Sequence, residues 1–210
     1  MATTDRRTEL QQTIRHLTSR WAQVDRQVLK HVFPLLARGL PVTKAPLVEA
    51  SGKPAVVIDR ALESGRVGLD ADDRIEELFG VQLKPTLHRV ELDSAILFTC
   101  CALVAHVVPR LLGRTVRVIS TDPISQAVCR IRIGRDGLEA VEPEAVVATM
   151  IVTDAVTIHE DAPLHFCDHV HHFASGDTAA AFVAGNRKRY TIRLEELDAA
   201  AEALYAAIWE

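Results

Sequence analysis

Apolar residues recur at helical spacing in the first part of the chain. This spacing predicts two helical segments between Leu10 and Ala37, with Gly39 ending the second. The first segment presents Ile14, Leu17 and Trp21, and the second presents Val28, Val32, Phe33 and Leu36.

Capping and turn residues predict two more short helices after Gly39. Pro41-Val42-Thr43 opens one with Thr43 as its N-cap, Ser51-Gly52 supplies a turn, and Pro54 precedes a helix over Ala55 to Glu63. This spacing is typical of a helix-turn-helix. Because short strands and turns are expected from Gly65 to Val90, we predict a winged-helix-like helical module over residues 1–85.

The remaining residues, 86–210, are expected to form the main core. A strand over His88 to Leu92 leads into a strongly apolar helix, Ala95 to Leu112, which Asp93 or Ser94 caps and Gly113 ends. The near absence of charge in this helix predicts that it is buried on most sides.

Strand-forming patterns and two helices follow this apolar segment. The expected strands are Thr115 to Ser120, Ala127 to Ile133, Leu138 to Val141 after a Gly134–Gly137 hairpin turn, and Val146 to Ile158. After an extended stretch over Pro163 to His172, Ser175 caps a helix over Asp177 to Ala184, and the last helix covers Leu194 to Trp209. The predicted class is α+β, with a helical module followed by an antiparallel or mixed β core packed with helices.

Composition argues against general binding to nucleic acid or membrane. The chain has a formal charge of −4, with 48% hydrophobic and 25% charged residues, and no long block of one sign. The candidate recognition helix offers only Lys53 and Arg60 as phosphate contacts, so the helical module is expected to pack rather than to bind DNA. The polar stretch Met1 to Gln12 does not resemble a signal peptide, and a cytoplasmic protein is expected.

Two segments carry unusual chemistry. Cys100-Cys101 lies in the predicted buried helix, and residues 166–173 place Cys167 beside Asp168 and three histidines. Four cysteines without a secreted framework are expected to be reduced, and Cys129 is interpreted as a small buried hydrophobe. A closed zinc site would have to combine Cys167 with Cys100 or Cys101, because no CxxC pair is present.

Several motifs in order resemble the bacterial organomercurial (alkylmercury) lyase family. They are Cys101-Ala102-Leu103, Pro109, Gly113-Arg114-Thr115, Ala140-Val141-Glu142-Pro143, Phe166-Cys167, His169-Val170-His171 and Phe173-Ala174-Ser175. The similarity covers nearly the whole chain and is weakest after about Gly185. It implies a cytosolic enzyme that protonolyses carbon–mercury bonds to Hg(II) and a hydrocarbon, without an added cofactor.

By motif position, the family's two essential thiols fall on Cys101 and Cys167. Mercury is soft and prefers thiolate, and a second sulfur weakens the bond to carbon until that carbon can take a proton. The family's catalytic aspartate is Val104 here, which carries no proton, and Asp122 stands where relatives carry another cysteine.

Substitutes for the missing acid are expected near the thiols. In an extended segment His169 shares the face of Cys167, so His169 is the first candidate proton donor, with a structural hydrogen-bonding role as its alternative. Asp168 would face away, and His106 and Cys100 lie off the Cys101 face of the predicted helix. A thiol that attacks mercury can also deliver its own proton, which leaves no base for the second thiol.

Two other functions stay open beside the lyase. The two sulfurs can bind Hg(II), Cu(I) or another soft ion without chemistry, and an enzyme of the same fold can act on another small substrate.

Overall fold

The computed structural model describes residues 3–21, 24–64, 67–160 and 165–210. Residues 65–66 and 163–164, which begin two of the predicted segments, lie outside these ranges.

Five helices form the first part of the chain. They are α1 (Thr3–Ser19), α2 (Arg26–Leu29), α3 (Val32–Leu36), α4 (Lys44–Ser51) and α5 (Ala55–Ser64). Thr43 is the N-cap residue of α4, as predicted, although its side chain makes no capping hydrogen bond. The predicted turn at Ser51-Gly52 ends α4, and Gly52 adopts a left-handed conformation at its C-cap. The second predicted segment is divided between α2 and α3. The winged-helix character of this part stays a prediction.

Eight strands form one antiparallel sheet. They are β1 (Gly68–Leu69), β2 (Ile75–Leu78), β3 (Val81–Gln82), β4 (His88–Glu91), β5 (Ile96–Thr99), β6 (Val116–Thr121), β7 (Val128–Gly134) and β8 (Gly137–Glu142). Their order is β1-β2-β3-β5-β4-β6-β7-β8. The predicted division at residue 85 therefore falls within one continuous sheet, because β3 pairs with β5; the division itself stays a prediction.

A second sheet and the remaining helices complete the fold. The strands β9 (Val147–Ile151), β10 (His172–Phe173) and β11 (Arg189–Ile192) pair in the order β10-β9-β11. The helical segments are α6 (Ala102–Leu112), α7 (Ala155–Glu160), the 3₁₀ turn η1 (Cys167–His169), α9 (Gly176–Ala184) and α10 (Leu194–Trp209). The last helix has the predicted bounds, and the Ser175 side chain accepts a hydrogen bond from the Thr178 amide as the predicted cap of α9.

The first half of the predicted apolar helix is a strand, so the prediction for Ala95 to Leu112 is wrong there. Residues Ile96–Thr99 form β5, which lies between β3 and β4 in the sheet. Asp93 and Ser94 belong to the turn before β5 and cap no helix. Strand pairing on both edges outweighs the helical interpretation of a short apolar run, which periodicity alone does not resolve. The helix α6 begins only after Cys101, its N-cap.

The predicted strand over Val146 to Ile158 is also too long. The strand β9 ends at Ile151, and Asp154 then accepts hydrogen bonds from the Thr157 amide and hydroxyl at the start of α7. This side-chain capping provides an alternative to the β ladder and starts a helix.

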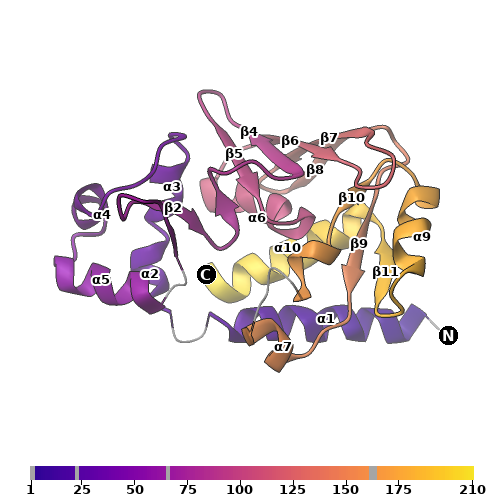
Figure 1. Ribbon diagram of the computed structural model, residues 1–210, viewed down its shortest axis with the longest axis horizontal. Helices are drawn as coiled ribbons and strands as arrows, with labels where there is room; N and C mark the ends of the chain where they lie inside the picture. Colours follow the sequence, from indigo (N-terminus) through magenta and orange to yellow (C-terminus); the bar gives the residue numbers. More distant parts are fainter. Residues whose placement is uncertain (1–2, 22–23, 65–66, 161–164) are drawn as a thin grey trace.

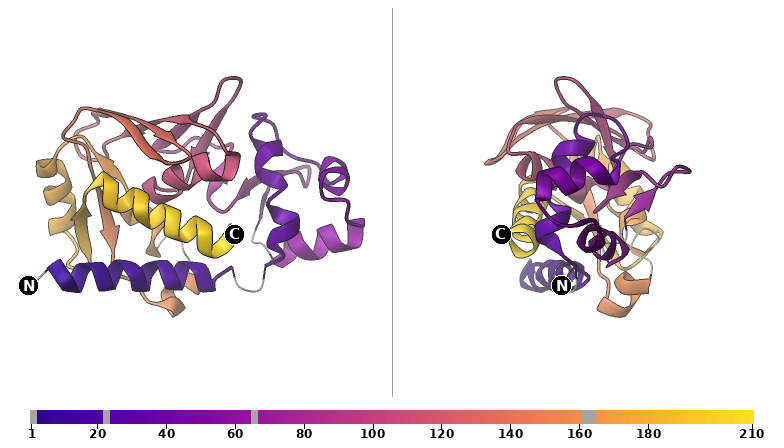
Figure 2. Two further views of the ribbon diagram at one scale, coloured as in Figure 1. Left: turned by 180° about the vertical axis from the view of Figure 1, so that it is seen from behind. Right: turned by 90° about the vertical axis from the view of Figure 1, so that its left-hand side faces the viewer.

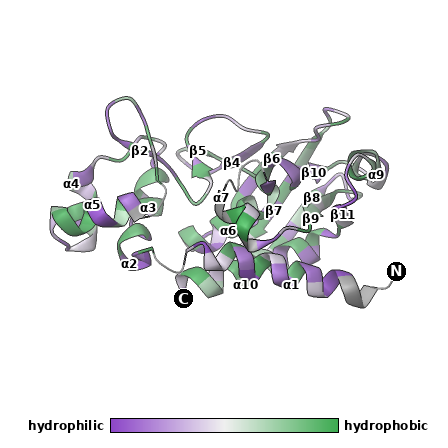
Figure 3. Ribbon diagram, turned by 60° about the horizontal axis from the view of Figure 1, so that its bottom comes forward, coloured by the Kyte–Doolittle hydropathy of each residue, from purple (hydrophilic) through white to green (hydrophobic). Residues whose placement is uncertain are grey.

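The helices α6 and α10 lie between the large sheet and α1 (Figures 1 and 2). All residues of α6 from Ala102 to Arg110 are buried. The hydropathy colouring in Figure 3 places apolar segments on α6 and α10 in the middle of the molecule. In the described part of the chain, no helix is both long and apolar enough to cross a membrane.

Candidate thiol site

Three cysteine sulfurs meet at the start of α6. The Sγ atoms of Cys100, Cys101 and Cys167 lie within 4.8 Å of one another, and those of Cys100 and Cys167 are 2.9 Å apart. All three thiols are free. The structure thus brings together Cys101 and Cys167, as the sequence predicts, and adds Cys100 to the cluster.

Backbone hydrogen bonds hold the three cysteine-bearing segments together. Cys100 follows β5, and its amide donates to the Gly80 carbonyl at 2.8 Å. Cys101 is extended at the N-cap of α6, and the next amide, that of Ala102, donates to the Val170 carbonyl just beyond η1 at 2.9 Å. Cys167 is the first residue of η1. The strand-to-helix junction at Cys100 and Cys101 therefore replaces the mid-helix position that the sequence predicts.

Gly80 provides the space that the cluster needs. It has a positive φ of 73°, and a Cβ at this position would collide with the Cys100 sulfur. Glycine is therefore required here both by the backbone conformation and by the close approach of the thiol.

The surroundings shift the pKa values of the three thiols in different directions. Burial alone raises the pKa of Cys101, but hydrogen bonds from Cys100 and Cys167 and from the Val104 amide lower it well below its ordinary value. Hydrogen bonding to Cys101, together with burial, raises the pKa of Cys100. The pKa of Cys167 is raised by its hydrogen bond to Cys101 and by burial, against the opposing effect of Cys100. Hydrogen bonding within the cluster thus favours the thiolate form at Cys101 and the thiol form at Cys100 and Cys167.

A mostly apolar cavity of about 100 Å³ opens onto two of the sulfurs. Cys100, Cys101 and Val104 line it. Its other walls come from Leu17, Arg20, Trp21, Glu77, Phe79, Gly80, Leu103, Phe166 and Leu204. Its volume approaches that of engineered apolar cavities that bind benzene.

Val104 leaves the cavity wall apolar at the position where the sequence resemblance implies an acid. Among the described lining residues, Glu77 is the one carboxyl group, and burial followed by the charge of Glu76 raises its pKa. Sequence patterns did not single out Glu77, because the strand pairing of β2 with β3 is what brings it to this cavity.

His169 does not lie on an extended segment, so the geometric reason for choosing it is wrong. Cys167–His169 is a 3₁₀ turn, in which residues two apart do not share a face. The His169 Nδ1 accepts hydrogen bonds from the Arg189 guanidinium at 2.9 and 3.1 Å, and burial and the Arg189 charge lower its pKa. These contacts favour its alternative role as a structural hydrogen-bonding residue.

Two other residues singled out by the sequence, Asp122 and Cys129, are buried and stabilise the fold. Asp122 is buried and accepts hydrogen bonds from the Ala174 amide and the Thr178 hydroxyl, which fixes the end of β10 to α9. Cys129 is buried on β7, and burial raises its pKa to about 11. The interpretation of Cys129 as a packing residue agrees with this environment.

Sulfur alone makes up the candidate metal-binding group. Among the described residues, the three cysteines are the one set of three or more potential ligands whose donor atoms lie this close together. This set lacks the fourth protein ligand of a closed structural zinc site and instead suits a soft, thiophilic ion.

Comparisons with known proteins agree on one family. A family model described as alkylmercury lyase matches residues 82–206. An alkylmercury lyase of Staphylococcus epidermidis is 31% identical over 153 residues, which cover 72% of this chain and 69% of that protein. One of Streptomyces lividans is 31% identical over 150 residues, 71% of this chain and 68% of that protein. The solved mercury-bound form of MerB2 has a similar fold, with a TM-score of 0.75 at 19% identity, over 96% of this chain and 99% of that one.

Proposed function

Because the chain belongs to the alkylmercury lyase family, we propose that it cleaves carbon–mercury bonds at the cluster of Cys100, Cys101 and Cys167. The substrate is a small organomercury cation, which enters through the apolar cavity beside Cys101 and Val104. The products are a hydrocarbon and Hg(II). The protein carries out this cleavage in the cytoplasm.

One observation carries this proposal: the sulfur atoms of three cysteines lie within reach of a single ion. A lone thiolate would only capture an organomercury cation. A second sulfur donates further electron density to mercury and weakens its bond to carbon, so the carbon becomes basic enough to accept a proton.

The charge distribution suggests an order of events. The Cys101 thiolate binds mercury first, because thiolate is the nucleophilic form. The thiol of Cys167 or Cys100 then binds the same mercury. Its proton goes to the carbon, the electron pair of the carbon–mercury bond forms the new carbon–hydrogen bond, and mercury remains Hg(II) on two sulfurs. On this route the thiol donates the proton, so no carboxylic acid is needed at position 104.

The test is incubation with phenylmercury acetate and measurement of benzene by gas chromatography. We expect one benzene per mercury bound. Stoichiometric binding of phenylmercury without benzene would instead support a soft-metal binding protein. Failure of phenylmercury to react with the free thiols would support an enzyme of the same fold with another substrate.

Restoring an acid at position 104 is expected to raise the rate. Val104→Asp places a carboxyl on the cavity wall beside Cys101, where a general acid contributes roughly a hundredfold or more. We expect at least about a tenfold faster release of benzene, at a stability cost of about 1–3 kcal/mol for burying the polar group. Val104→Asn is the matched control, since it has a similar shape and no acidic proton. Equal rates for the two variants would show that Val104 is not what limits the reaction.

A further inference from the structure

A chain of buried hydrogen bonds crosses the core from the thiol site toward the surface. It contains four imidazoles and one hydroxyl, those of His171, His88, Ser120, His172 and His106, which we call the imidazole chain. All are fully buried except His171, which is 9% exposed. They come from β4, β6, α6 and the segment around β10, which are far apart in sequence.

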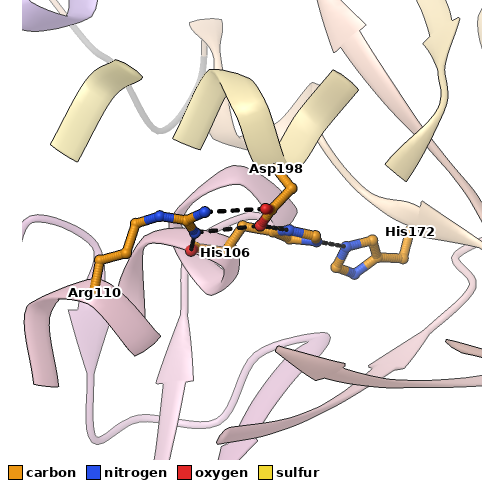
Figure 4. Close-up of polar contacts among 4 residues, drawn as sticks. All are labelled: His106, Arg110, His172 and Asp198. Carbon is orange, nitrogen blue, oxygen red and sulfur yellow. Dashed lines mark hydrogen bonds and ion pairs between the residues drawn. The ribbon is translucent and has the colours of Figure 1, made fainter. Parts of the chain in front are cut away.

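Six hydrogen bonds connect the imidazole chain and its two ends. The His171 ring bonds to the Asp168 carbonyl at 3.1 Å and to His88 at 3.2 Å. Ser120 bridges His88 and His172, at 2.9 and 2.8 Å. His106 bonds to His172 at 3.2 Å and to the Asp198 carboxylate at 3.0 Å, and Figure 4 shows this end of the chain.

The imidazole chain has one hydrogen too few for its links. Each neutral imidazole supplies one N–H, and Ser120 supplies one O–H, so the five groups offer five hydrogens for six links. Both ends are acceptors, the Asp168 carbonyl and the Asp198 carboxylate, so neither end can supply the missing hydrogen. One additional proton completes every link and turns one imidazole into an imidazolium.

The surroundings place such a charge at the ends of the chain. Burial lowers the pKa of His88 and His172, in the middle, well below the ordinary value. Burial also lowers the pKa of His106 and His171, but Asp198 opposes this effect at His106, and the Asp168 carbonyl and the charges of Cys101 and Asp168 oppose it at His171. Arg189 and Arg110 are the cations that face the two ends. Shifting one hydrogen in each intervening link moves the charge from one end to the other.

One end lies at the thiol site. His171 is bonded to the carbonyl of Asp168, the residue after Cys167, and the carbonyl of its own neighbour Val170 accepts from the Ala102 amide, directly after Cys101. The other end lies near the surface. Asp198 is held by two hydrogen bonds from Arg110 (Figure 4), and Arg110 lines a surface hollow of about 360 Å³ together with Glu202 and Tyr205.

We propose that the imidazole chain is a proton conduit that carries a proton between the buried thiol site and solvent at Asp198. This inference rests on the proposed function. It supplies the base that the proposed reaction needs to accept a thiol proton. An organomercury cation and two thiols give a hydrocarbon, Hg(II) on two thiolates, and one proton. One thiol proton leaves with the carbon. The other is the proton that Cys101 must lose to become the thiolate, and the imidazole chain carries it out of a site in which Cys101 is fully buried.

Ser120→Ala tests the conduit, because it removes two links and changes no ionisable group. Thr178→Val is the matched control, since it removes a hydroxyl bonded to Asp122 outside the imidazole chain. Mercuric chloride is mixed with protein in weak buffer. Mercury–thiolate absorbance reports binding, and an indicator dye reports released protons.

In the unmodified protein and in Thr178→Val, protons should appear together with mercury–thiolate absorbance. In Ser120→Ala, proton release should lag behind binding by about tenfold or more, whereas loss of structure would slow both signals equally. Asp198→Asn, which changes the solvent end of the imidazole chain, should give the same lag of proton release behind mercury binding. Coincident signals in both variants would overturn the proposal. Because mercuric chloride has no carbon–mercury bond, this result is independent of whether phenylmercury yields benzene.

Discussion

Cys167→Ser and Cys101→Ser are each expected to lower benzene release from phenylmercury by roughly a thousandfold or more, the scale seen when a residue of a catalytic unit is removed. Serine is similar in shape, but its hydroxyl neither ionises near neutral pH nor binds mercury strongly. Single-turnover benzene release, measured by gas chromatography, checks this expectation.

The two variants should fail in different ways. Without Cys101 the cluster lacks its thiolate, so capture of phenylmercury should slow. Without Cys167, phenylmercury should still bind to Cys101 and keep its phenyl group. Cys129→Ser is the matched control, since this buried thiol lies outside the cluster, and it should retain benzene release. A Cys167→Ser protein that releases benzene at the original rate would leave Cys100 as the second sulfur.

Mild acid should destabilise the protein strongly. Burial lowers the pKa of His88, His106, His171 and His172 below that of an unfolded histidine, about 6.5. The stabilising effect of neutral imidazoles is therefore complete above pH 6.5 and is lost as the pH falls below it, because the unfolded chain then binds more protons. His88 and His172, whose pKa values lie well below the ordinary value, stay neutral in the folded protein, and each contributes about 1.4 kcal/mol per pH unit.

The free energy of unfolding should thus fall by about 3 kcal/mol per pH unit below pH 6.5. A domain of ordinary stability, about 5–15 kcal/mol, would lose much of it within about two pH units. Urea unfolding at pH 7.5, 6.5 and 5.5 measures this slope. The carboxylates of Asp122 and Asp198, whose pKa values are lowered, add a further loss only at more acidic pH. Equal urea midpoints at the three pH values would show that the imidazoles titrate in the folded protein as they do in the unfolded chain.

Elements fixed by local signals could be predicted from the sequence. Thr43 and Ser175 are N-caps, Gly113 ends α6, and the amphipathic pattern of α10 gave its bounds. Elements that form through pairing with distant strands could not be predicted. The strand β5 exists because β3 and β4 lie on either side of it, and no local pattern separates such a run from a buried helix.

The site residues likewise divide into those with local sequence signals and those placed by distant contacts. The motifs pointed to Cys101 and Cys167, whose sulfurs meet in the fold. Cys100 was judged from an ideal helix, so its sulfur was placed away from the cluster. The strand-to-helix junction turns it toward Cys167 instead, and Gly80 makes room for it. The imidazole chain has no local sequence signal, because all of its hydrogen bonds except that from His171 to the Asp168 carbonyl join residues between 32 and 92 positions apart.

Mercury coordination before and after reaction tests the central claim most directly. X-ray absorption at the mercury edge should find carbon and sulfur around phenylmercury immediately after mixing with one equivalent of protein. After benzene release it should find two or three sulfurs and no carbon. Mercury that keeps its carbon and a single sulfur throughout would contradict cleavage by the thiol cluster.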